Sequence, residues 1–95
     1  MVSFDLKGRI AVVTGASRGI GRAIAETLAG EGANLVLVAR SADALELLAG
    51  SLSDKYGIEA TPVVADLSNA AEVETLCSQV SETYRPDMLV NNAGG

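Results

Sequence analysis

The chain has 95 residues, of which 48% are hydrophobic and 20% charged, and its formal net charge at pH 7 is −5. This length suits one small domain; the apolar content excludes intrinsic disorder, and the scattered basic residues argue against a nucleic-acid partner. A single cysteine, an N-terminus without an apolar leader and the lack of any apolar run near the ~20 residues of a membrane span predict a cytoplasmic protein outside the membrane.

Short apolar runs alternate with longer amphipathic segments along the chain. The runs are typical of buried strands, and the longer segments have apolar residues at helical spacing. In chain order, the sequence predicts a strand over residues 9–14, a helix over 19–29, a strand over 34–39, a helix from Ser41 to about Tyr56, a strand over 59–64, a helix that starts at Asn69 and is broken by Pro86, and a strand over 87–90.

Each predicted helix carries an apolar stripe that we expect to face the core. The three stripes are Ile20, Ala23, Ile24, Thr27 and Leu28; Ala42, Leu45, Leu48, Ala49 and Leu52; and Val73, Leu76, Cys77, Val80 and Tyr84. Cys77 is thus interpreted as a small core residue. Ser41 is the expected N-cap of the second helix, and Asn69 with Glu72 is the expected capping box of the third.

The element order βαβαβαβ predicts an α/β fold, a Rossmann-type doubly wound parallel sheet with strand order 3-2-1-4. Two helices then cover one face of the sheet and the third helix covers the other. The second face is thinly covered, and the fourth strand is a bare edge. We therefore expect residues 1–95 to form a single, partial domain that is truncated before its later strands.

The glycine-rich segment TGASRGIG, residues 14–21, joins the first strand to the first helix. At such a turn, backbone N–H groups and the positive end of the helix dipole face a ligand beyond the strand, an arrangement that suits a pyrophosphate. Glycines allow the tight turn and the close approach of the ligand. The alternative is an ordinary strand-to-helix turn in which glycine only supplies positive φ.

Three motifs together resemble the cofactor-site signature of the classical short-chain dehydrogenase/reductase family. They are the glycine-rich segment, Asp66-Leu67 after the third strand, and the NNAG run of residues 91–94 after the fourth. The resemblance spans nearly the whole chain. It implies the cofactor-binding half of an oxidoreductase that transfers hydride between NADPH and a small-molecule carbonyl or alcohol, with 3-oxoacyl-[acyl-carrier-protein] reductase-like members as one possibility.

The resemblance also implies a role for each matching residue. Gly15, Gly19 and Gly21 shape the phosphate turn, and the backbone N–H of Ile20 faces the pyrophosphate. Asp66 accepts a hydrogen bond from the adenine amino group, or is merely a loop carboxylate near a helix start. The remaining implied neighbours of the cofactor are Leu67 at the adenine ring and Asn92, Ala93 and Gly94 at the ribose; for Asn91 a structural role and a ligand role stay open.

The choice between NAD and NADP depends on the residues after the second strand. NAD-binding proteins usually place a carboxylate there, which would repel a 2′-phosphate. This chain has Arg40 and Ser41 instead, with Arg18 and Ser17 in the glycine-rich turn. Guanidinium groups and hydroxyls suit a phosphate, so the sequence predicts NADP(H). The alternative is that both arginines are solvated surface residues.

A catalytic group is not expected in this chain. In the family, a Ser, a Tyr and a Lys four residues after that Tyr carry the reaction, and all follow the NNAG run. Here Tyr56 is followed four positions later by Ala60, and Tyr84 by Met88. Histidine is absent, and no metal-ligand cluster is found in the sequence. The chain by itself is therefore predicted to be inactive, and the complete enzyme is expected to be a homo-oligomer.

A second class of function stays open. The chain could be a stand-alone, non-catalytic nucleotide-binding or interaction module, with the bare edge of the last strand as its partner surface. A chain that stops directly after the NNAG run favours a fragment of a reductase over such a module.

Overall fold

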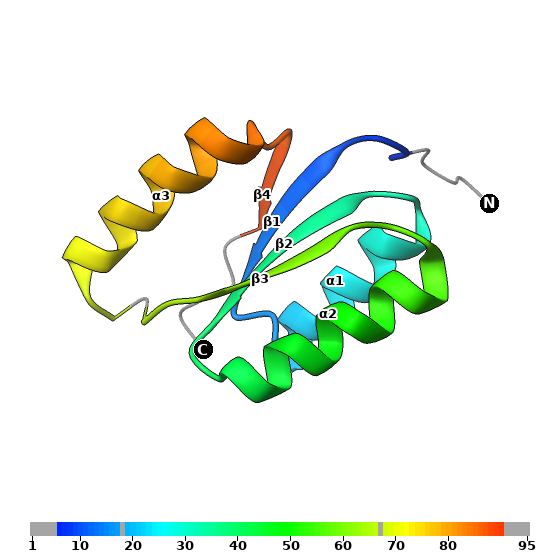
Figure 1. The fold of residues 1–95 in the computed structure, drawn as a ribbon, viewed down its shortest axis with the longest axis horizontal. Helices are drawn as coiled ribbons and strands as arrows, with labels where there is room; N and C mark the ends of the chain where they lie inside the picture. The colour runs from blue at the N-terminus through cyan, green and yellow to red at the C-terminus, as the bar shows by residue number, and fades with distance from the viewer. Residues whose placement is uncertain (1–5, 18, 67, 91–95) are drawn as a thin grey trace.

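Strands and helices alternate along the chain in the computed structural model, which describes residues 6–17, 19–66 and 68–90 (Figure 1). All the predicted elements are present, and their ends lie within one residue of the predicted ends. They are β1 (Ile10–Thr14), α1 (Gly19–Gly30), β2 (Asn34–Ala39), α2 (Ala42–Tyr56), β3 (Ala60–Val64), α3 (Ala70–Tyr84) and β4 (Met88–Val90).

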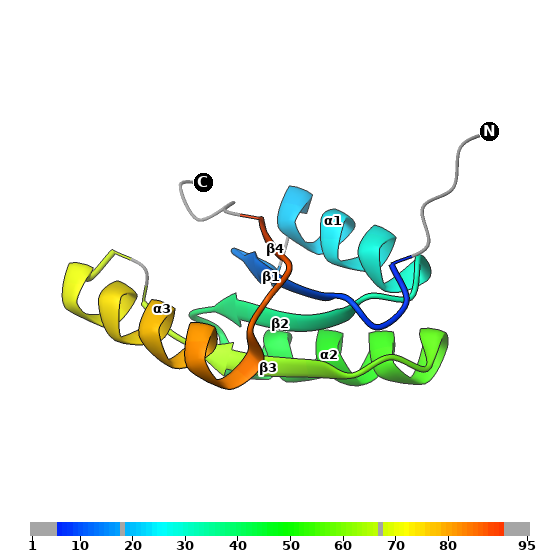
Figure 2. The same cartoon turned by 90° about the horizontal axis from the view of Figure 1, so that it is seen from above.

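The strands form one parallel sheet in the order β3-β2-β1-β4, which confirms the predicted α/β topology. In the middle of the sheet Val12 pairs with Val36 on one side and with Leu89 on the other. Helices α1 and α2 lie together on one face of the sheet, and α3 lies on the opposite face (Figures 1 and 2). Side chains of alternate strand residues point to opposite faces, so two apolar clusters form, one under each set of helices.

Helix α1 packs on the sheet through its small residues, which corrects the predicted stripe. Gly21, Ala25 and Ala29 are buried, and their spacing of four residues brings the helix backbone close to the strands. Ile20 is 70% exposed. The predicted core residues Ala23 and Thr27 are exposed, and Ile24 and Leu28 are half-buried. The reason is space: leucines and valines of β1 and β2 already fill the interface, and only small helix residues fit above them.

Helix α2 agrees better with the sequence pattern. The buried residues of this helix are Leu45, Leu48, Ala49 and Leu52, as predicted. Ala42, the first member of the predicted stripe, is exposed, because it stands in the first turn, before the helix runs over the core. The helix ends at Gly57, whose φ of 68° and N–H bond to the carbonyl of Ser53 form a left-handed C-cap.

Helix α3 covers the second face with Leu76 and Val80, which pack on a cluster that includes Val12, Val36 and Val38. Val73 and Tyr84 are half-buried at the two ends of this stripe. Cys77 is exposed, so its interpretation as a core residue is wrong. The buried stripe is centred on residues four apart, and the position after Leu76 turns by about 100° away from it.

The second face is only partly covered, as the topology predicted. Leu89 of β4 is 65% exposed although its neighbour in the sheet, Val12, is 4% exposed. In the sheet of the described residues β4 pairs only with β1, so its other edge is open. No helix in the described part of the chain is long and apolar enough to cross a membrane.

Candidate nucleotide-binding site

Three loops meet where the strands end, at the carboxyl edge of the sheet. Two backbone hydrogen bonds join them: the N–H of Ala16 donates to the carbonyl of Val38 (3.2 Å), and the N–H of Ala65 donates to the carbonyl of Ala39 (3.0 Å). The turn after β1, the segment that begins with Arg40 and the segment that contains Asp66 are therefore held side by side. In open parallel sheets this edge is where ligands bind.

The glycine-rich turn has the backbone that its sequence predicted. Gly15 and Gly19 have φ angles of 63° and 62°, in the left-handed region that favours glycine. Ala16 between them is completely buried and anchors the turn in the core. A Cβ atom built on Gly19 would have no atom of the described chain within 4 Å, so the space beside this glycine is open.

Helix α1 begins at Gly19, and its first turn contains no acidic residue. Unpaired N–H groups and the positive end of the helix dipole are therefore not neutralised from within this turn. Ser17 lies half-buried just before the helix. The turn, its open side and the helix start together could hold a phosphate group.

Arg40 and Ser41 are both exposed directly after β2. Ser41 is the N-cap of α2 by position, but its side chain makes no capping hydrogen bond. The first turn of α2 is closed through the backbone, since the carbonyl of Ser41 accepts from the N–H of Leu45 at 3.1 Å. Arg40 makes no ion pair with any described residue. A guanidinium and a hydroxyl are thus available beside the turn.

Asp66 is held by Ser68. The hydroxyl and the N–H of Ser68 both donate to Oδ1 of Asp66, at 2.7 and 3.0 Å. These two bonds, and to a smaller extent the nearby charge of Arg40, hold the pKa of Asp66 below its usual value, so the carboxyl group is ionised at neutral pH. An ionised carboxylate is an acceptor of hydrogen bonds and suits an amino group of a ligand.

The start of α3 differs from the predicted capping box. Oδ1 of Asn69 accepts from the N–H groups of Ala71 and Glu72, at 3.0 and 3.2 Å, as an N-cap does. The carboxylate of Glu72 does not reach back to Asn69; it accepts from the N–H of Asp66 at 3.4 Å. The reason is that the N–H of Asn69 already donates to the carbonyl of Asp66. Glu72 consequently helps to fix the loop that carries Asp66.

Five of the predicted cofactor neighbours are not described by the structure. Arg18, Leu67, Asn92, Ala93 and Gly94, together with Asn91, lie outside the described residues. The described part of the predicted site is brought together at one edge of the sheet: Gly15, Ser17, Gly19, Ile20, Gly21, Arg40, Ser41 and Asp66. Sequence reasoning missed Ser68. An Asp followed two residues later by Ser is a pattern typical of local turns, and it was the available signal.

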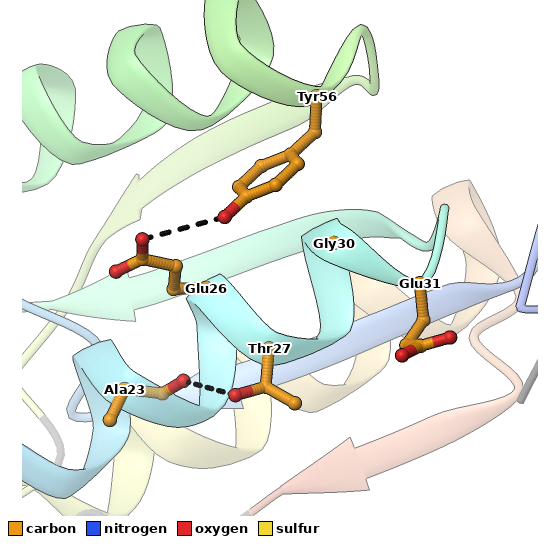
Figure 3. Close-up of a pocket in the computed structure, with 6 residues that line it drawn as sticks. All are labelled: Ala23, Glu26, Thr27, Gly30, Glu31 and Tyr56. Carbon is orange, nitrogen blue, oxygen red and sulfur yellow. Dashed lines mark hydrogen bonds between the residues drawn. The ribbon is translucent and has the colours of Figure 1, made fainter. Parts of the chain in front are cut away.

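A separate hollow of about 460 Å³ lies between α1 and α2 (Figure 3). Its walls include Glu26, Gly30 and Tyr56; the tyrosine hydroxyl donates to the carboxylate of Glu26 at 3.4 Å. Lys55 also contacts this carboxylate, at 3.1 Å, and lowers the pKa of Glu26. These groups join α1 to the C-terminal end of α2 and are not part of the glycine-rich turn. Among the described residues no group of three His, Cys, Asp or Glu side chains could hold a metal ion.

The family model of the short chain dehydrogenases matches residues 9–95. This match covers the glycine-rich turn and the whole sheet, so the chain belongs to the short-chain dehydrogenase family. The fold supports the same assignment. The L-sorbose reductase from Gluconobacter frateurii, solved as a complex with NADPH and L-sorbose, superimposes with a TM-score of 0.87 at 43% identity, over 97% of this chain and 36% of that one.

Curated relatives differ in their activity. The 3-oxoacyl-[acyl-carrier-protein] reductase FabG of Escherichia coli is 42% identical over 91 residues, which are 95% of this chain and 36% of the reductase. The inactive hydroxysteroid dehydrogenase-like protein 1 of Pongo abelii is 40% identical over 87 residues, 92% of this chain and 26% of that protein. The chain thus spans roughly a quarter to a third of the length of these relatives.

Proposed function

We propose that the chain is the NADP(H)-binding part of an oxidoreductase that transfers hydride between NADPH and a carbonyl or alcohol substrate. One observation carries the choice of cofactor. Arg40 and the uncommitted hydroxyl of Ser41 stand at the end of β2, where a binder of NAD would need a carboxylate. That the related L-sorbose reductase forms a complex with NADPH supports the same choice.

The residues at the carboxyl edge fit such a cofactor. The open space beside Gly19 leaves room for a pyrophosphate, and the N–H of Ile20 lies at the helix start that would bind it. Gly15 gives the turn its left-handed backbone, and the buried Gly21 lets α1 approach the sheet. The bound cofactor would supply or accept the hydride; the residues of this chain would bind and orient it.

The adenosine end would lie across the ends of β2 and β3. Arg40 and Ser41 would bind the 2′-phosphate, with Arg18 and Ser17 as further donors from the turn. Asp66 would accept a hydrogen bond from the adenine amino group. Family resemblance supports roles near the adenine ring and the ribose for four residues outside the described part of the chain, which are Leu67, Asn92, Ala93 and Gly94.

The complete enzyme would need residues that this sequence does not contain. Neither Tyr56 nor Tyr84 is followed by a lysine four positions later, and Tyr56 is bonded to Glu26 in the hollow between α1 and α2. We therefore propose that the 95 residues alone do not catalyse a reaction, and that the complete protein is a homo-oligomer. A 3-oxoacyl substrate is the candidate that the similarity to FabG favours.

The proposed cofactor preference is tested by Arg40→Asp. Measured by titration of the intact protein, the substitution should weaken NADPH binding by about 10-fold or more, because it replaces a charge-assisted phosphate contact by a repulsion, and should change NADH binding much less. Arg85→Asp makes the same change of charge at the C-cap of α3 and should leave both affinities nearly unchanged. Equal losses for the two cofactors in Arg40→Asp would contradict the proposed phosphate contact.

A second candidate function is a non-catalytic interaction module. The exposure of Leu89 beside the open edge of β4 favours it, because apolar surface of this kind is common at partner interfaces. The same titration discriminates between the two candidates. An intact protein that binds neither NADPH nor NADH would support the interaction module.

A further inference from the structure

Asp66 is fixed through one of its two carboxylate oxygens. Both hydrogen bonds from Ser68 end on Oδ1, at 2.7 Å from the hydroxyl and 3.0 Å from the N–H. Oδ2 accepts no hydrogen bond from the described residues. The two oxygens of this carboxylate are therefore not equivalent: one is committed to the chain and the other is left for a ligand.

The loop around this pair is itself held in place. Asp66 donates its N–H to Glu72 of α3, and its carbonyl accepts from the N–H of Asn69. Asn69 is anchored in turn as the N-cap of the helix. Asp66 and Asn69 are thus held in place, and the two donors of Ser68 hold one oxygen of the Asp66 carboxylate.

We propose that Ser68 is a positioning residue that holds the Asp66 carboxylate in one orientation, with its second oxygen toward the nucleotide base, and thereby strengthens the preference for an amino group over a carbonyl group at position 6 of the purine. This inference rests on the proposed function. Ser68 itself touches no ligand in this scheme. Its donors hold Oδ1, so Oδ2, an obligate acceptor, faces the base and selects a donor there.

A hypoxanthine analogue of NADPH is the probe, because a carbonyl oxygen replaces the 6-amino group of its purine. The wild-type protein should bind NADPH about 10-fold more tightly than this analogue, the effect of one hydrogen bond to a charged group. Ser68→Ala removes the shorter of the two bonds to Asp66, and we expect the ratio to fall to roughly threefold or less, since only the backbone bond remains. Ser68→Thr keeps the hydroxyl and should restore the wild-type ratio.

Asp66→Asn makes the test sharper, because the two atoms at the end of an asparagine side chain differ. The N–H of Ser68 requires an acceptor, so the amide oxygen must take the place of Oδ1 and the amide NH₂ must take the place of Oδ2. The variant should therefore prefer the hypoxanthine cofactor. Adding Ser68→Ala leaves this N–H in place and removes only the hydroxyl bond that steadies the side chain, so the inverted ratio should persist but become smaller.

A merely structural role of Ser68 would lower both affinities equally and leave the ratio unchanged. Ser53→Ala is the matched control: its hydroxyl donates to the carbonyl of Ile58 at 2.7 Å, far from Asp66, and its removal should leave the ratio at the wild-type value. If Ser68→Ala changes the ratio of the two affinities neither in the wild-type protein nor in the Asp66→Asn variant, the inference is overturned. An intact protein that binds NADPH without discriminating the analogue would overturn it too, whereas failure to bind NADPH at all would overturn the proposed function itself.

Discussion

At the scale of single residues, two glycines with nearly the same backbone separate folding from ligand binding. Gly19 has a φ of 62° and Gly57 a φ of 68°, and a Cβ on either would have no described atom within 4 Å. A side chain at either position therefore meets the same conformational strain, about 1–2 kcal/mol, without a steric clash inside the protein. The difference is location, because only Gly19 lies in the proposed phosphate turn.

This pair predicts the outcome of two valine substitutions. Gly19→Val should lower the affinity for NADPH by roughly 100-fold or more, because the side chain fills the approach to the turn and removes phosphate contacts. Gly57→Val should lower the free energy of unfolding by about 1–2 kcal/mol, the strain expected at both positions, and should leave the affinity for NADPH within about twofold of the wild-type value. Urea denaturation and fluorescence titration measure the two quantities. Unchanged NADPH affinity in Gly19→Val would refute the site.

At the scale of elements, the two N-caps of the longer helices work differently. Asn69 accepts two backbone hydrogen bonds at the start of α3, while the hydroxyl of Ser41 accepts none at the start of α2. Asn69→Ala should therefore lower the free energy of unfolding by about 1 kcal/mol, and Ser41→Ala by only a few tenths. Thermal or urea denaturation checks this. An equal cost at both positions would mean that Ser41 caps its helix in solution and is less available for a phosphate.

The start of β4 is joined to β1 by Asp87. Its carboxylate accepts from the N–H of Ile10 at 2.9 Å and lies 3.4 Å from Nη1 of Arg9, and its own N–H donates to the carbonyl of Ile10. The hydrogen bond from Ile10 and, to a smaller extent, the Arg9 charge hold the pKa of Asp87 below its usual value. The pairing of the short strand β4 with β1 is thus stabilised by the ionised carboxylate of the residue just before β4.

A dependence of stability on pH follows. Because the pKa of Asp87 is lower in the folded chain than the unfolded value of about 3.9, the carboxylate stabilises the fold fully above that value, and this contribution is lost as the pH falls through the folded-state pKa. Asp87→Ala should be less stable than the wild type at pH 7, and the difference should shrink in acid. Urea denaturation at several pH values measures it; a difference that stays constant down to pH 2 would contradict the assignment.

At the scale of the whole molecule, the sheet ends in an open edge. β4 contributes three residues, and its Leu89 is 65% exposed beside a covered Val12. An unpaired edge with exposed apolar side chains favours association with another polypeptide. The described residues therefore leave a surface that either more of the same polypeptide or another copy would cover.

The isolated 95-residue chain should accordingly self-associate and show no reductase turnover. Leu89→Lys should reduce its association, because the charge is placed beside the open edge. Leu47→Lys is the matched control: Leu47 is 76% exposed on α2, and the same change there should have little effect. Sedimentation velocity of the three chains measures the association. A monomeric wild-type chain at high concentration would contradict this prediction, and turnover by it would mean that catalytic residues were missed.

Most of the fold was predictable because its signals are local. Continuous apolar runs define buried strands, and glycines at 15, 19 and 57 stand where positive φ is needed. The glycine-rich turn and Arg40 were predicted from their positions after strands, and Asp66 was predicted from the family resemblance. Parallel strands bring their carboxyl ends to one edge, which places these residues close together whatever the packing details. The buried face of α1 was not predictable in this way, because apolar spacing favours large residues such as Ile20, whereas the distance to the sheet selected glycine and alanine.

The sequence by itself determined the element order, the strand order that follows from it, and the family, because each depends on patterns of adjacent residues. The tertiary structure decided which side chains the core takes, as Cys77 and Ile20 show by their exposure. It also decided which partner each polar group finds: Glu72 bonds to Asp66 instead of Asn69, and Ser68 holds one oxygen of Asp66. Such choices depend on distances between elements and on competing donors, which no spacing in the sequence encodes.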